Sequence, residues 1–355
     1  MTKKMRVGLI AGGLSCEHEI TLASCRNVLE AIDKNKYEPI PLFIDKAGAW
    51  HLIEPHVLLS RSPIDLVREG LAGVHGAAFA PLHDLRAGAF DVIFPLLHGP
   101  FGEDGSVQGL FKLLRLPFVG AGILGSAVSM DKDVMKRLLM GAGLPVTRFQ
   151  VFRGPLTSDD IERLVAAWSF PLFVKPANMG SSVGVRKVHS RAELADAARY
   201  ALTYDRKILV EKFVPGKEIE CAILGNDDPL VSLVGEVRHA SEFYDYETKY
   251  LDDELVIEVP APLPQAISER AQALAKTAFQ VLECEGMARV DMFLEPTGEI
   301  LLNEINTIPG FTATSTYPRL WGASGIAYEA LIDRLIQLAI ARHEQESALK
   351  TGTAK

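Results

Sequence analysis

The chain has 355 residues, 48% of them hydrophobic and 23% charged, which predicts two or three domains with real cores and excludes a single small module or a disordered chain. Lys plus Arg number 37 and Asp plus Glu 45, so the formal net charge is −8, and we expect no dedicated nucleic-acid binder. The 4 cysteines show no C-x-x-C spacing, and no apolar run approaches the roughly 18 residues of a membrane helix. We therefore expect a cytoplasmic protein without zinc knuckles, disulfides or membrane spans.

The first third of the chain alternates between strand and helix patterns. Strands are predicted at 5–10 and 37–44 around a helix at 16–32. A buried strand at 90–97 precedes a Gly-rich loop, a helix at 107–114 and a short strand at 117–119. This βαβ rhythm predicts a Rossmann-like parallel sheet. Residues 54–87 give no clear pattern, and their structure stays open.

The remainder mixes both element types in two further segments. The first is predicted to have helices at 129–140, 158–167 and 191–202 and strands at 149–152, 172–175, 183–188 and 207–211. The second is predicted to have strands at 217–224 and 230–237, a polar loop at 239–254, a helix at 265–282, a hairpin at 287–306 and a helix at 326–343. We expect an α/β domain at 1–125, followed by α+β domains at 126–212 and 213–355.

The hairpin carries the most specific chemistry. If Thr297-Gly298 closes a two-residue turn, Asp291 lies opposite Glu304 and Arg289 opposite Asn306, with all four side chains on one face. Two carboxylates about 4 Å apart repel by about 4 kcal/mol at an effective dielectric of about 20, which exceeds the ~0.2–1 kcal/mol of a good cross-strand pair. Mg²⁺ or Mn²⁺, with substrate phosphates completing its shell, would relieve the repulsion. The alternative is a solvated face on which Arg289 pairs with Asp291.

Other segments suit anion binding. Residues 307–312 form a Pro-Gly turn whose backbone N–H groups can face an oxyanion. Lys175 ends an apolar strand before the small-residue loop 178–184, which can wrap phosphates or simply connect a hairpin. Residues 211–216 join two strands and are either an adenine-binding hinge or a domain linker. His98, at a strand's carboxyl end, is either a site residue or a core histidine held by backbone.

Two nucleotide signatures are weak or missing. Residues 120–125 match G-x-G-x-x-G, but they do not follow the first strand of a mononucleotide unit, and no acidic residue lies about 20 positions later. We therefore expect no dinucleotide site there. No G-x-x-x-x-G-K-[ST] pattern is present, so a P-loop enzyme is not expected.

In this order, the segments together resemble the D-alanine:D-alanine ligases of the ATP-grasp superfamily. Nearly the whole chain takes part, through GGLSCEHEI, LLHGPFGEDGSVQG, SMDK, VKPANMGSSVGV, LVEKFVPGKEIE, FYDYETKY, MARVDMF and NEINTIPGFTATS. The resemblance implies a three-domain ATP-grasp architecture with nucleotide held between the central and C-terminal domains. It also implies ligation of two D-alanines through a D-alanyl phosphate, releasing ADP and phosphate, for peptidoglycan precursors. Another ATP-grasp carboxylate-amine ligase or a non-catalytic nucleotide-binding module are the alternatives.

The resemblance further implies residue roles. Glu17 would bind the first D-alanine's ammonium, Arg289 and the Gly310 N–H would stabilise the tetrahedral oxyanion, Lys249 would reach the γ-phosphate from a lid, and Tyr250 would favour dipeptide over ester. The implied metal ligands for two Mg²⁺ (or Mn²⁺) ions are Asp291, Glu304 and Asn306. The implied ATP contacts are Lys132, Lys175, Ser181, Ser182, Glu211, Lys212, Phe213, Val214, Glu218 and Lys249. The implied catalytic and substrate contacts are Glu17, His98, Ser181, Tyr250, Arg289, Gly310 and Ser315. By analogy, a homodimer is expected.

Overall fold

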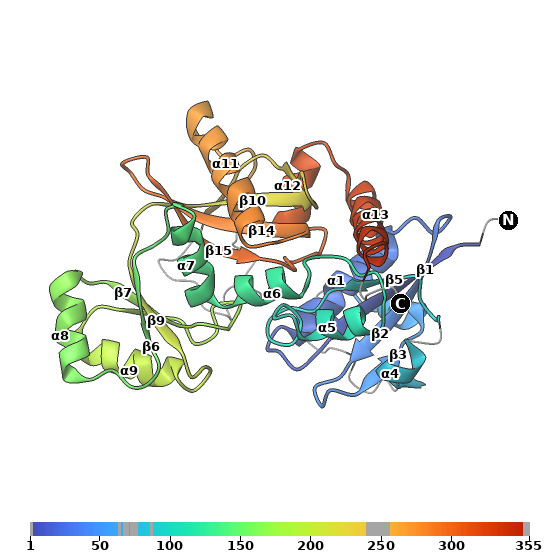
Figure 1. Ribbon diagram of the computed structural model, residues 1–355, viewed down its shortest axis with the longest axis horizontal. Helices are drawn as coiled ribbons and strands as arrows, with labels where there is room; N and C mark the ends of the chain where they lie inside the picture. The colour runs from blue at the N-terminus through green and yellow to red at the C-terminus, as the bar shows by residue number, and fades with distance from the viewer. Residues whose placement is uncertain are drawn as a thin grey trace.

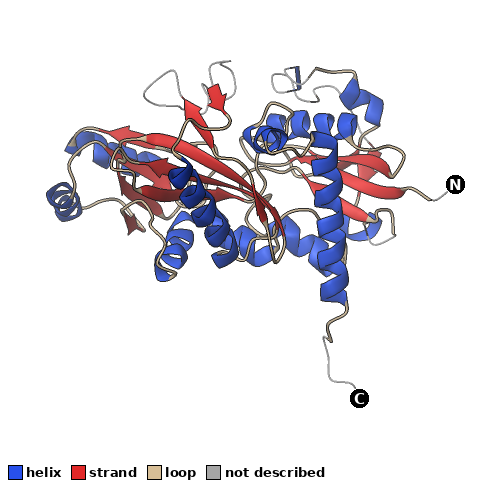
Figure 2. Cartoon of the chain, turned by 90° about the horizontal axis from the view of Figure 1, so that it is seen from above, coloured by secondary structure: helices blue, strands red, loops and turns tan. Residues whose placement is uncertain are grey.

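The computed structural model describes residues 3–62, 65–66, 71, 77–85, 88–238 and 256–350. Its strands form three sheets, which define a first, second and third unit in chain order (Figure 1). Seen from above in Figure 2, the strands near the N-terminus form one group and those of the other two units form another. Within the described ranges, no helix is both long and apolar enough to cross a membrane.

The first unit holds a sheet in the order β4-β3-β2-β1-β5. Its elements are β1 (Met5–Gly12), α1 (His18–Ala31), β2 (Tyr37–Ile44), β3 (Trp50–Leu52), α2 (Pro55–Leu59), β4 (Ala77–Phe79), α4 (Pro81–Asp84), β5 (Val92–Pro95) and α5 (Ser106–Leu113). The central strands β2, β1 and β5 are parallel, as the βαβ rhythm predicts. Two short strands extend this sheet by antiparallel pairing, β3 with β2 and β4 with β3, and neither was predicted. Three-residue strands are too short to show the period-2 pattern that would have revealed them.

The second unit is an antiparallel sheet in the order β6-β9-β7-β8. The elements from its leading helices onward are α6 (Ile123–Met130), α7 (Lys132–Gly141), β6 (Phe149–Phe152), α8 (Ser158–Ala167), β7 (Leu172–Pro176), β8 (Arg186–Val188), α9 (Arg191–Ala201) and β9 (Ile208–Lys212). Where one helix was predicted at 129–140, there are two. Asp131 separates them, because its side chain accepts hydrogen bonds from the N–H groups of Asp133 and Val134 and so starts α7 anew.

The third unit is an antiparallel sheet in the order β13-β12-β10-β14-β15, with β11 paired to β10. Its elements are β10 (Lys217–Gly225), β11 (Leu230–Val231), β12 (Gly235–Arg238), β13 (Val256–Glu258), α11 (Gln265–Val281), β14 (Gly286–Leu294), β15 (Ile300–Asn306), α12 (Thr316–Ala323) and α13 (Tyr328–Ser347). The strand predicted at 230–237 is split into β11 and β12. Helix α12 was not predicted, because its eight residues include Pro318 and Gly322, which obscure the helical period.

The first and third units share one hydrophobic core. Buried side chains of β1, β5 and α1 pack in the same cluster as Leu331, Leu335 and Ile336 of α13, and Figure 1 shows α13 beside these elements. Arg342 of α13, itself buried, donates to the carbonyl oxygens of Gly120 at 2.6 Å and of Phe118 at 2.7 Å. These contacts hold the first unit against the third.

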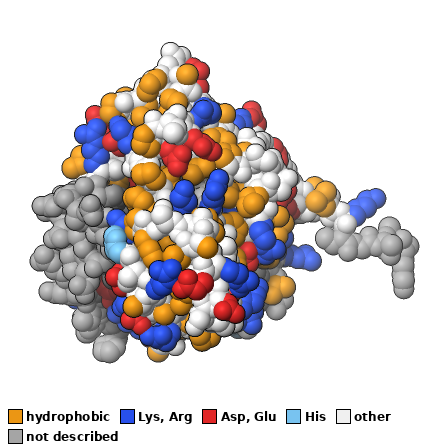
Figure 3. All heavy atoms as spheres, turned by 90° about the vertical axis from the view of Figure 1, so that its left-hand side faces the viewer, with side chains coloured by type: hydrophobic (Ala, Val, Ile, Leu, Met, Phe, Trp, Pro, Cys, Tyr) orange, Lys and Arg blue, Asp and Glu red, His pale blue; other side chains and the backbone are white. Residues whose placement is uncertain are grey.

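The second unit has a separate core and a mixed surface. Its cluster of buried residues comes from β7, β9, α8 and α9. On the face drawn in Figure 3, acidic and basic side chains are interspersed with hydrophobic ones, so charge of one sign does not dominate the described part of that face. The expected mixed α/β architecture of three units is confirmed by the sheets.

Candidate active site

The β14–β15 hairpin brings the four predicted side chains together by a route that differs from the prediction. Asp291 pairs with Glu304, and Arg289 with Asn306. The turn, however, has three residues, because Glu295 N–H donates to the Glu299 carbonyl at 2.8 Å. The register then shifts between Asp291 and Met292, which leaves one extra residue on β15. This β-bulge restores the pairing that a two-residue turn would have given. The predicted turn was wrong, and the predicted pairing is confirmed.

Arg289 is the centre of charge on this face. Its Nε and Nη2 atoms donate to the two oxygens of Asp291 at 2.7 and 2.6 Å, and its Nε lies 3.3 Å from Oε2 of Glu220 on β10. Burial lowers the pKa of the guanidinium, but the charges of Asp291 and Glu220 raise it well above its usual value. The Arg289–Asp291 pair, which the sequence offered as the alternative to a metal site, is therefore present. It places a fixed cation beside the carboxylates.

The donor set fits a hard divalent cation that shares its shell with phosphate. Asp291 and Glu304 supply carboxylates from facing positions, and Asn306 supplies an amide that donates to Asp291 Oδ2 at 2.9 Å. In the described part of the chain, no three His, Cys, Asp or Glu side chains converge as a metal cluster by themselves. Two carboxylates and one amide oxygen leave several positions to other ligands, as in sites where Mg²⁺ is bound with substrate phosphates.

Lys132 links this face to the small-residue loop. It is the first residue of α7, and its Nζ lies 3.5 Å from Glu304 Oε2 while donating to the Met179 carbonyl at 2.7 Å. Its own N–H donates to the Ala177 carbonyl at 3.0 Å. One ammonium therefore touches both the acidic hairpin face and the loop predicted to wrap phosphates. The Lys132 ammonium is therefore placed where it could neutralise the charge of a phosphate chain.

A buried cluster of opposite charges lies behind the hairpin. Lys175 Nζ is 2.8 Å from Glu211 Oε2 and 3.3 Å from Asn303 Oδ1. Lys136 Nζ is 3.3 Å from Glu211 Oε1. Burial raises the pKa of Glu211, but the charges of Lys136 and Lys175 outweigh burial and lower it. Burial also lowers the pKa of Lys136 to about 8. Glu211 is thus an ionised carboxylate between two lysines.

The first unit meets the second at Glu17 and Ser181. The Ser181 hydroxyl donates to Glu17 Oε1, and Glu17 lies directly before α1, where the helix dipole favours negative charge. A Cβ added at Gly99 or Gly180 would lie 3.2 or 3.1 Å from Glu17 Oε2, so both glycines permit a close approach. Ser181 and Ser182 have φ of 47° and 58°, an uncommon backbone region that is often held at functional sites.

His98 and Glu103 fix the turn that follows the hairpin. His98 Nδ1 lies 2.9 Å from the Ile308 carbonyl oxygen. Glu103 accepts the Ile308 N–H at 3.2 Å and the Gly99 N–H at 2.6 Å. Both backbone groups of Ile308 are therefore held by the first unit. Gly310, two residues on, is positioned by this anchor.

The position of Glu103 predicts a pH-dependent stability. Burial, followed by the charge of Glu17, raises the pKa of Glu103 from 4.5 to about 8. The stability contributed by its protonated form is complete below pH 4.5 and is lost as the pH rises through about 8. We expect the unfolding free energy of the native protein, measured by urea titration, to fall between these pH values more than that of Glu103→Gln. The exposed Glu344→Gln should keep the native profile, and parallel profiles for native protein and Glu103→Gln would contradict the assignment.

The other predicted residues are placed less tightly. In the hinge after β9, Lys212 and Glu218 are exposed, Phe213 lies 6.2 Å from the Phe173 ring between centroids, and Val214 is half-buried. Ser315 accepts the Thr312 N–H at 3.1 Å, and a Cβ at Gly310 would lie 3.1 Å from its hydroxyl oxygen. The predicted roles of Lys249 and Tyr250 fall on positions outside the described residues.

The glycines of the G-x-G-x-x-G match serve packing. A Cβ added at Gly125 would lie 2.4 Å from the Glu283 carbonyl oxygen. A Cβ added at Gly286, where β14 begins, would lie 3.1 Å from Gly120 Cα. These close approaches account for small residues at 120 and 125 without a ligand. They support the expectation that no dinucleotide site lies there.

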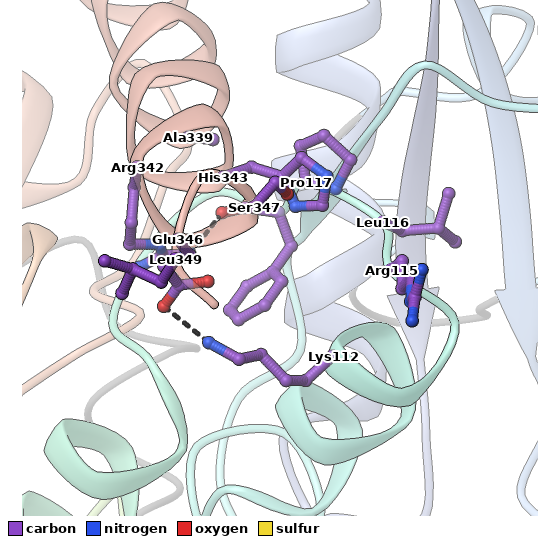
Figure 4. Close-up of a pocket in the computed structure, with 11 residues that line it drawn as sticks. Lys112, Arg115, Leu116, Pro117, Ala339, Arg342, His343, Glu346, Ser347 and Leu349 are labelled. Atoms are coloured by element: carbon purple, nitrogen blue, oxygen red, sulfur yellow. Dashed lines mark hydrogen bonds and ion pairs between the residues drawn. The ribbon is translucent and has the colours of Figure 1, made fainter. Parts of the chain in front are cut away.

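A cavity of about 250 Å³ lies away from this network, between α5 and α13 (Figure 4). Its lining includes Lys112, Phe118, Arg342 and Glu346. Lys112 is ion-paired with Glu346, and Arg342 is bound to the Phe118 carbonyl. These three charged side chains thus have contacts of their own. None of the predicted site residues lines this cavity, so we assign no role to it.

Three residues of the network were missed by sequence reasoning: Glu103, Lys136 and Glu220. Glu220 lies directly opposite Asp291 on the neighbouring strand, and its alternation with Glu218 was visible without its register. Lys136 follows Lys132 by four residues, and i,i+4 spacing on a helix was a usable signal. Glu103 sits in a Gly-rich loop, where no local pattern indicates that its carboxyl group reaches another unit.

The chain is similar to known proteins over nearly its whole length. The family model described as D-ala D-ala ligase N-terminus matches residues 6–121, and that described as D-ala D-ala ligase C-terminus matches residues 138–337. The D-alanine–D-alanine ligase of Shouchella clausii is 47% identical, with 98% of each chain covered. D-alanine–D-alanine ligase A of Escherichia coli K12 is 46% identical, with 98% of this chain and 99% of that protein covered.

Solved structures agree. The D-alanine-D-alanine ligase of Coxiella burnetii has a TM-score of 0.84 at 39% identity, covering 98% of this chain and 97% of that one. The D-Ala:D-Ser ligase of Enterococcus faecalis has a TM-score of 0.83 at 34% identity, covering 95% and 100%. The ligase of Bacillus anthracis complexed with ATP has a TM-score of 0.74 at 28% identity, covering 96% and 99%. With both family models and these whole-length relatives in agreement, the chain belongs to the D-alanine–D-alanine ligase family, and its fold is the ATP-grasp fold expected from the sequence.

Proposed function

We propose that this protein joins two D-alanine molecules into D-alanyl-D-alanine at the expense of ATP, in the synthesis of peptidoglycan precursors. One observation carries the proposal. A continuous set of contacts runs from Glu17 and Ser181, through the loop carbonyl bound by Lys132, to Glu304 and its cross-strand partner Asp291. A carboxylate that can attract an ammonium is thereby connected to a lysine that can neutralise phosphate and to carboxylates that can hold a cation.

The nucleotide side of this arrangement would lie between the sheets of the second and third units. Lys132 and Lys175 would offset phosphate charge, with the loop at Ser181 and Ser182 donating N–H groups. The hinge from Glu211 to Glu218 would bind adenine and ribose, with Lys212, Phe213 and Val214 as its middle. Bound ATP, with Mg²⁺ or Mn²⁺ held by Asp291, Glu304 and Asn306, would supply the phosphoryl group that activates a carboxylate. Positioning and charge neutralisation are the protein's main contributions to such a transfer.

The amino-acid side would lie between the first and third units. Glu17 would bind the ammonium of the first D-alanine, and the Ser181 hydroxyl would hold the Glu17 carboxylate in place. Arg289 and the Gly310 N–H would stabilise the oxyanion when the second D-alanine's amine attacks the D-alanyl phosphate. His98 would position Gly310 through Ile308, and Ser315 would support the same turn. Lys249 and Tyr250 keep their proposed roles as a γ-phosphate contact and a determinant of dipeptide formation.

The second substrate is the most open part of the specificity. Relatives of similar structure include a D-Ala:D-Ser ligase, so D-serine as the second amine is a specific alternative. It would use the same Glu17 and Arg289 network for the first D-alanine. The two possibilities differ only in which amine accepts the acyl group. Product analysis distinguishes them directly.

The decisive assay is amino-acid-dependent phosphate release. Incubation with ATP, Mg²⁺ and D-alanine alone should release phosphate and yield D-alanyl-D-alanine, whereas L-alanine should give neither. A parallel reaction with equal D-alanine and D-serine should still yield mainly D-alanyl-D-alanine. Phosphate release at the same rate with and without D-alanine would refute the proposal. A mixed dipeptide ending in D-serine as the main product would establish the alternative.

We propose domains at 1–125, 126–212 and 213–355, whose limits separate the three sheets. An ATP-consuming synthetic enzyme is expected in the cytoplasm, and a homodimer is expected by analogy with the family. Sedimentation of the purified full chain measures the last of these.

A further inference from the structure

Lys136 is a fully buried lysine that the proposed reaction does not use. It lies on α7, four residues after Lys132, and its side chain has 0% exposure. Its ammonium donates to the Thr147 hydroxyl at 2.5 Å and lies 3.3 Å from Glu211 Oε1. Taking an ammonium out of water is costly unless a partner compensates it. Glu211 is the charged partner that compensates the buried Lys136 ammonium.

Glu211 has two basic partners with different further contacts. Lys175 contacts its Oε2 at 2.8 Å and also reaches Asn303 at 3.3 Å. Asn303 is the residue before the proposed metal ligand Glu304, so Lys175 spans the distance between Glu211 and the phosphate side. Lys136 instead contacts Thr147 and Glu211, and its side chain is fully buried. If Lys175 turned to a bound phosphate, Lys136 would remain beside Glu211.

Thr147 fixes the orientation of the Glu211 carboxylate. Its hydroxyl accepts from Lys136 and donates to Glu211 Oε2 at 3.3 Å. Its N–H donates to the Leu302 carbonyl of β15 at 3.3 Å. The Lys136–Thr147 pair therefore fixes the Glu211 carboxylate relative to both the second unit's sheet and the third unit's hairpin. A carboxylate held in this way accepts from an exocyclic amine in one orientation.

We propose that Lys136 is a positioning residue for base selection. It is the counter-ion that stays beside Glu211 after Lys175 turns to the phosphates. It keeps the Glu211 carboxylate ionised and oriented to accept a hydrogen bond from the amino group of an adenine nucleotide. The inference rests on the proposed nucleotide site. It goes further by assigning purine discrimination to a residue that does not touch the nucleotide. A guanine nucleotide presents a carbonyl oxygen at the corresponding ring position and would meet the ionised carboxylate unfavourably.

The test is nucleotide binding measured by calorimetry on the whole protein with Mg²⁺. Lys136→Met should weaken ADP binding by roughly 30-fold or more, as for truncation of one partner of a buried charge pair, and should weaken GDP binding much less. Lys207→Met is the matched control. Lys207 is also a buried lysine, paired with Asp131 at 2.6 Å, and its loss should leave the ADP-to-GDP affinity ratio as in the native protein.

A double-mutant cycle separates positioning from general destabilisation. In a Glu211→Gln background, Lys136→Met should leave ADP affinity unchanged, because there is no carboxylate left to orient. If Lys136→Met does not fold, the native protein provides the same information through pH. The charged groups facing Lys136 are Glu211 of β9, Lys175 of β7 and Glu304 of β15. ADP affinity of the native protein should fall as the pH rises above about 8, and Glu211→Gln should not show this fall.

The outcomes are distinct. Native protein that binds neither ADP nor ATP would refute the proposed function itself. Native protein that binds ADP, with an unchanged ADP-to-GDP ratio in Lys136→Met, would refute the role of Lys136 and leave the proposed function standing. A Lys136→Met effect that persists in full in the Glu211→Gln background would also refute it.

Discussion

Replacing Glu304 by alanine is expected to lower D-alanine-dependent phosphate release by about 100-fold or more. Loss of one group that stabilises charge in the transition state typically has an effect of this size. Glu304 is one of the two carboxylates that face each other across β14 and β15, and it lies 3.5 Å from Lys132 Nζ. Its removal takes a ligand from the proposed cation site and leaves Lys132 without that counter-charge. Steady-state kinetics at saturating ATP and D-alanine measure the effect.

The Mg²⁺ dependence makes this test specific. The concentration of Mg²⁺ needed for half-maximal rate should rise in Glu304→Ala, because fewer protein ligands hold the cation. Glu299→Ala is a matched control, since Glu299 is an exposed acid at the turn of the same hairpin. Its rate and Mg²⁺ requirement should equal those of the native protein. Near-native turnover of Glu304→Ala at saturating Mg²⁺ would remove Glu304 from the ligand set.

Local chemistry in the sequence predicted the acidic face well. Alternation places Arg289 with Asp291 on one side of β14 and Glu304 with Asn306 on one side of β15, and the two pairs share a face only when the register is right. The register was right because two deviations cancel: a three-residue turn and a bulge next to Asp291. A one-residue slip alone would have turned the facing side chains apart. Pattern reasoning could not see either deviation, because each depends on backbone geometry rather than residue type.

Contacts between segments far apart in the sequence were beyond such reasoning. Glu103 binds Ile308 from another unit, and Lys136 reaches Glu211 across the junction of α7 and β9. In both cases the residue type is ordinary for its local setting, a loop acid and a helix lysine. What makes them part of the site is burial by segments far away in the sequence. The resemblance to a family supplied the roles of Glu17 and Ser181, which local pattern alone would have assigned to a helix start and a loop.

Substitution of Arg289 by methionine is expected to affect both stability and turnover. The guanidinium lies between Asp291 and Glu220, and the side chains of all three are at most 15% exposed. Removing it takes the paired cation away from two buried carboxylates, and breaking a buried pair typically costs about 3–5 kcal/mol. Loss of a donor to the oxyanion would lower turnover by a further 100- to 1000-fold, roughly. Urea unfolding and steady-state kinetics measure the two effects separately.

Two further measurements identify the cause of each effect. Arg289→Lys keeps a charge but not the two-pronged contact with Asp291, so we expect it to recover most of the stability and little of the turnover. Mg²⁺ with ADP should raise the melting temperature of Arg289→Met more than that of the native protein, because the cation would replace the missing positive charge beside Asp291. Equal Mg²⁺ shifts in the two proteins would mean that the cation binds away from this carboxylate. A methionine variant as stable as the native protein would mean that Asp291 and Glu220 are not held by Arg289 in solution.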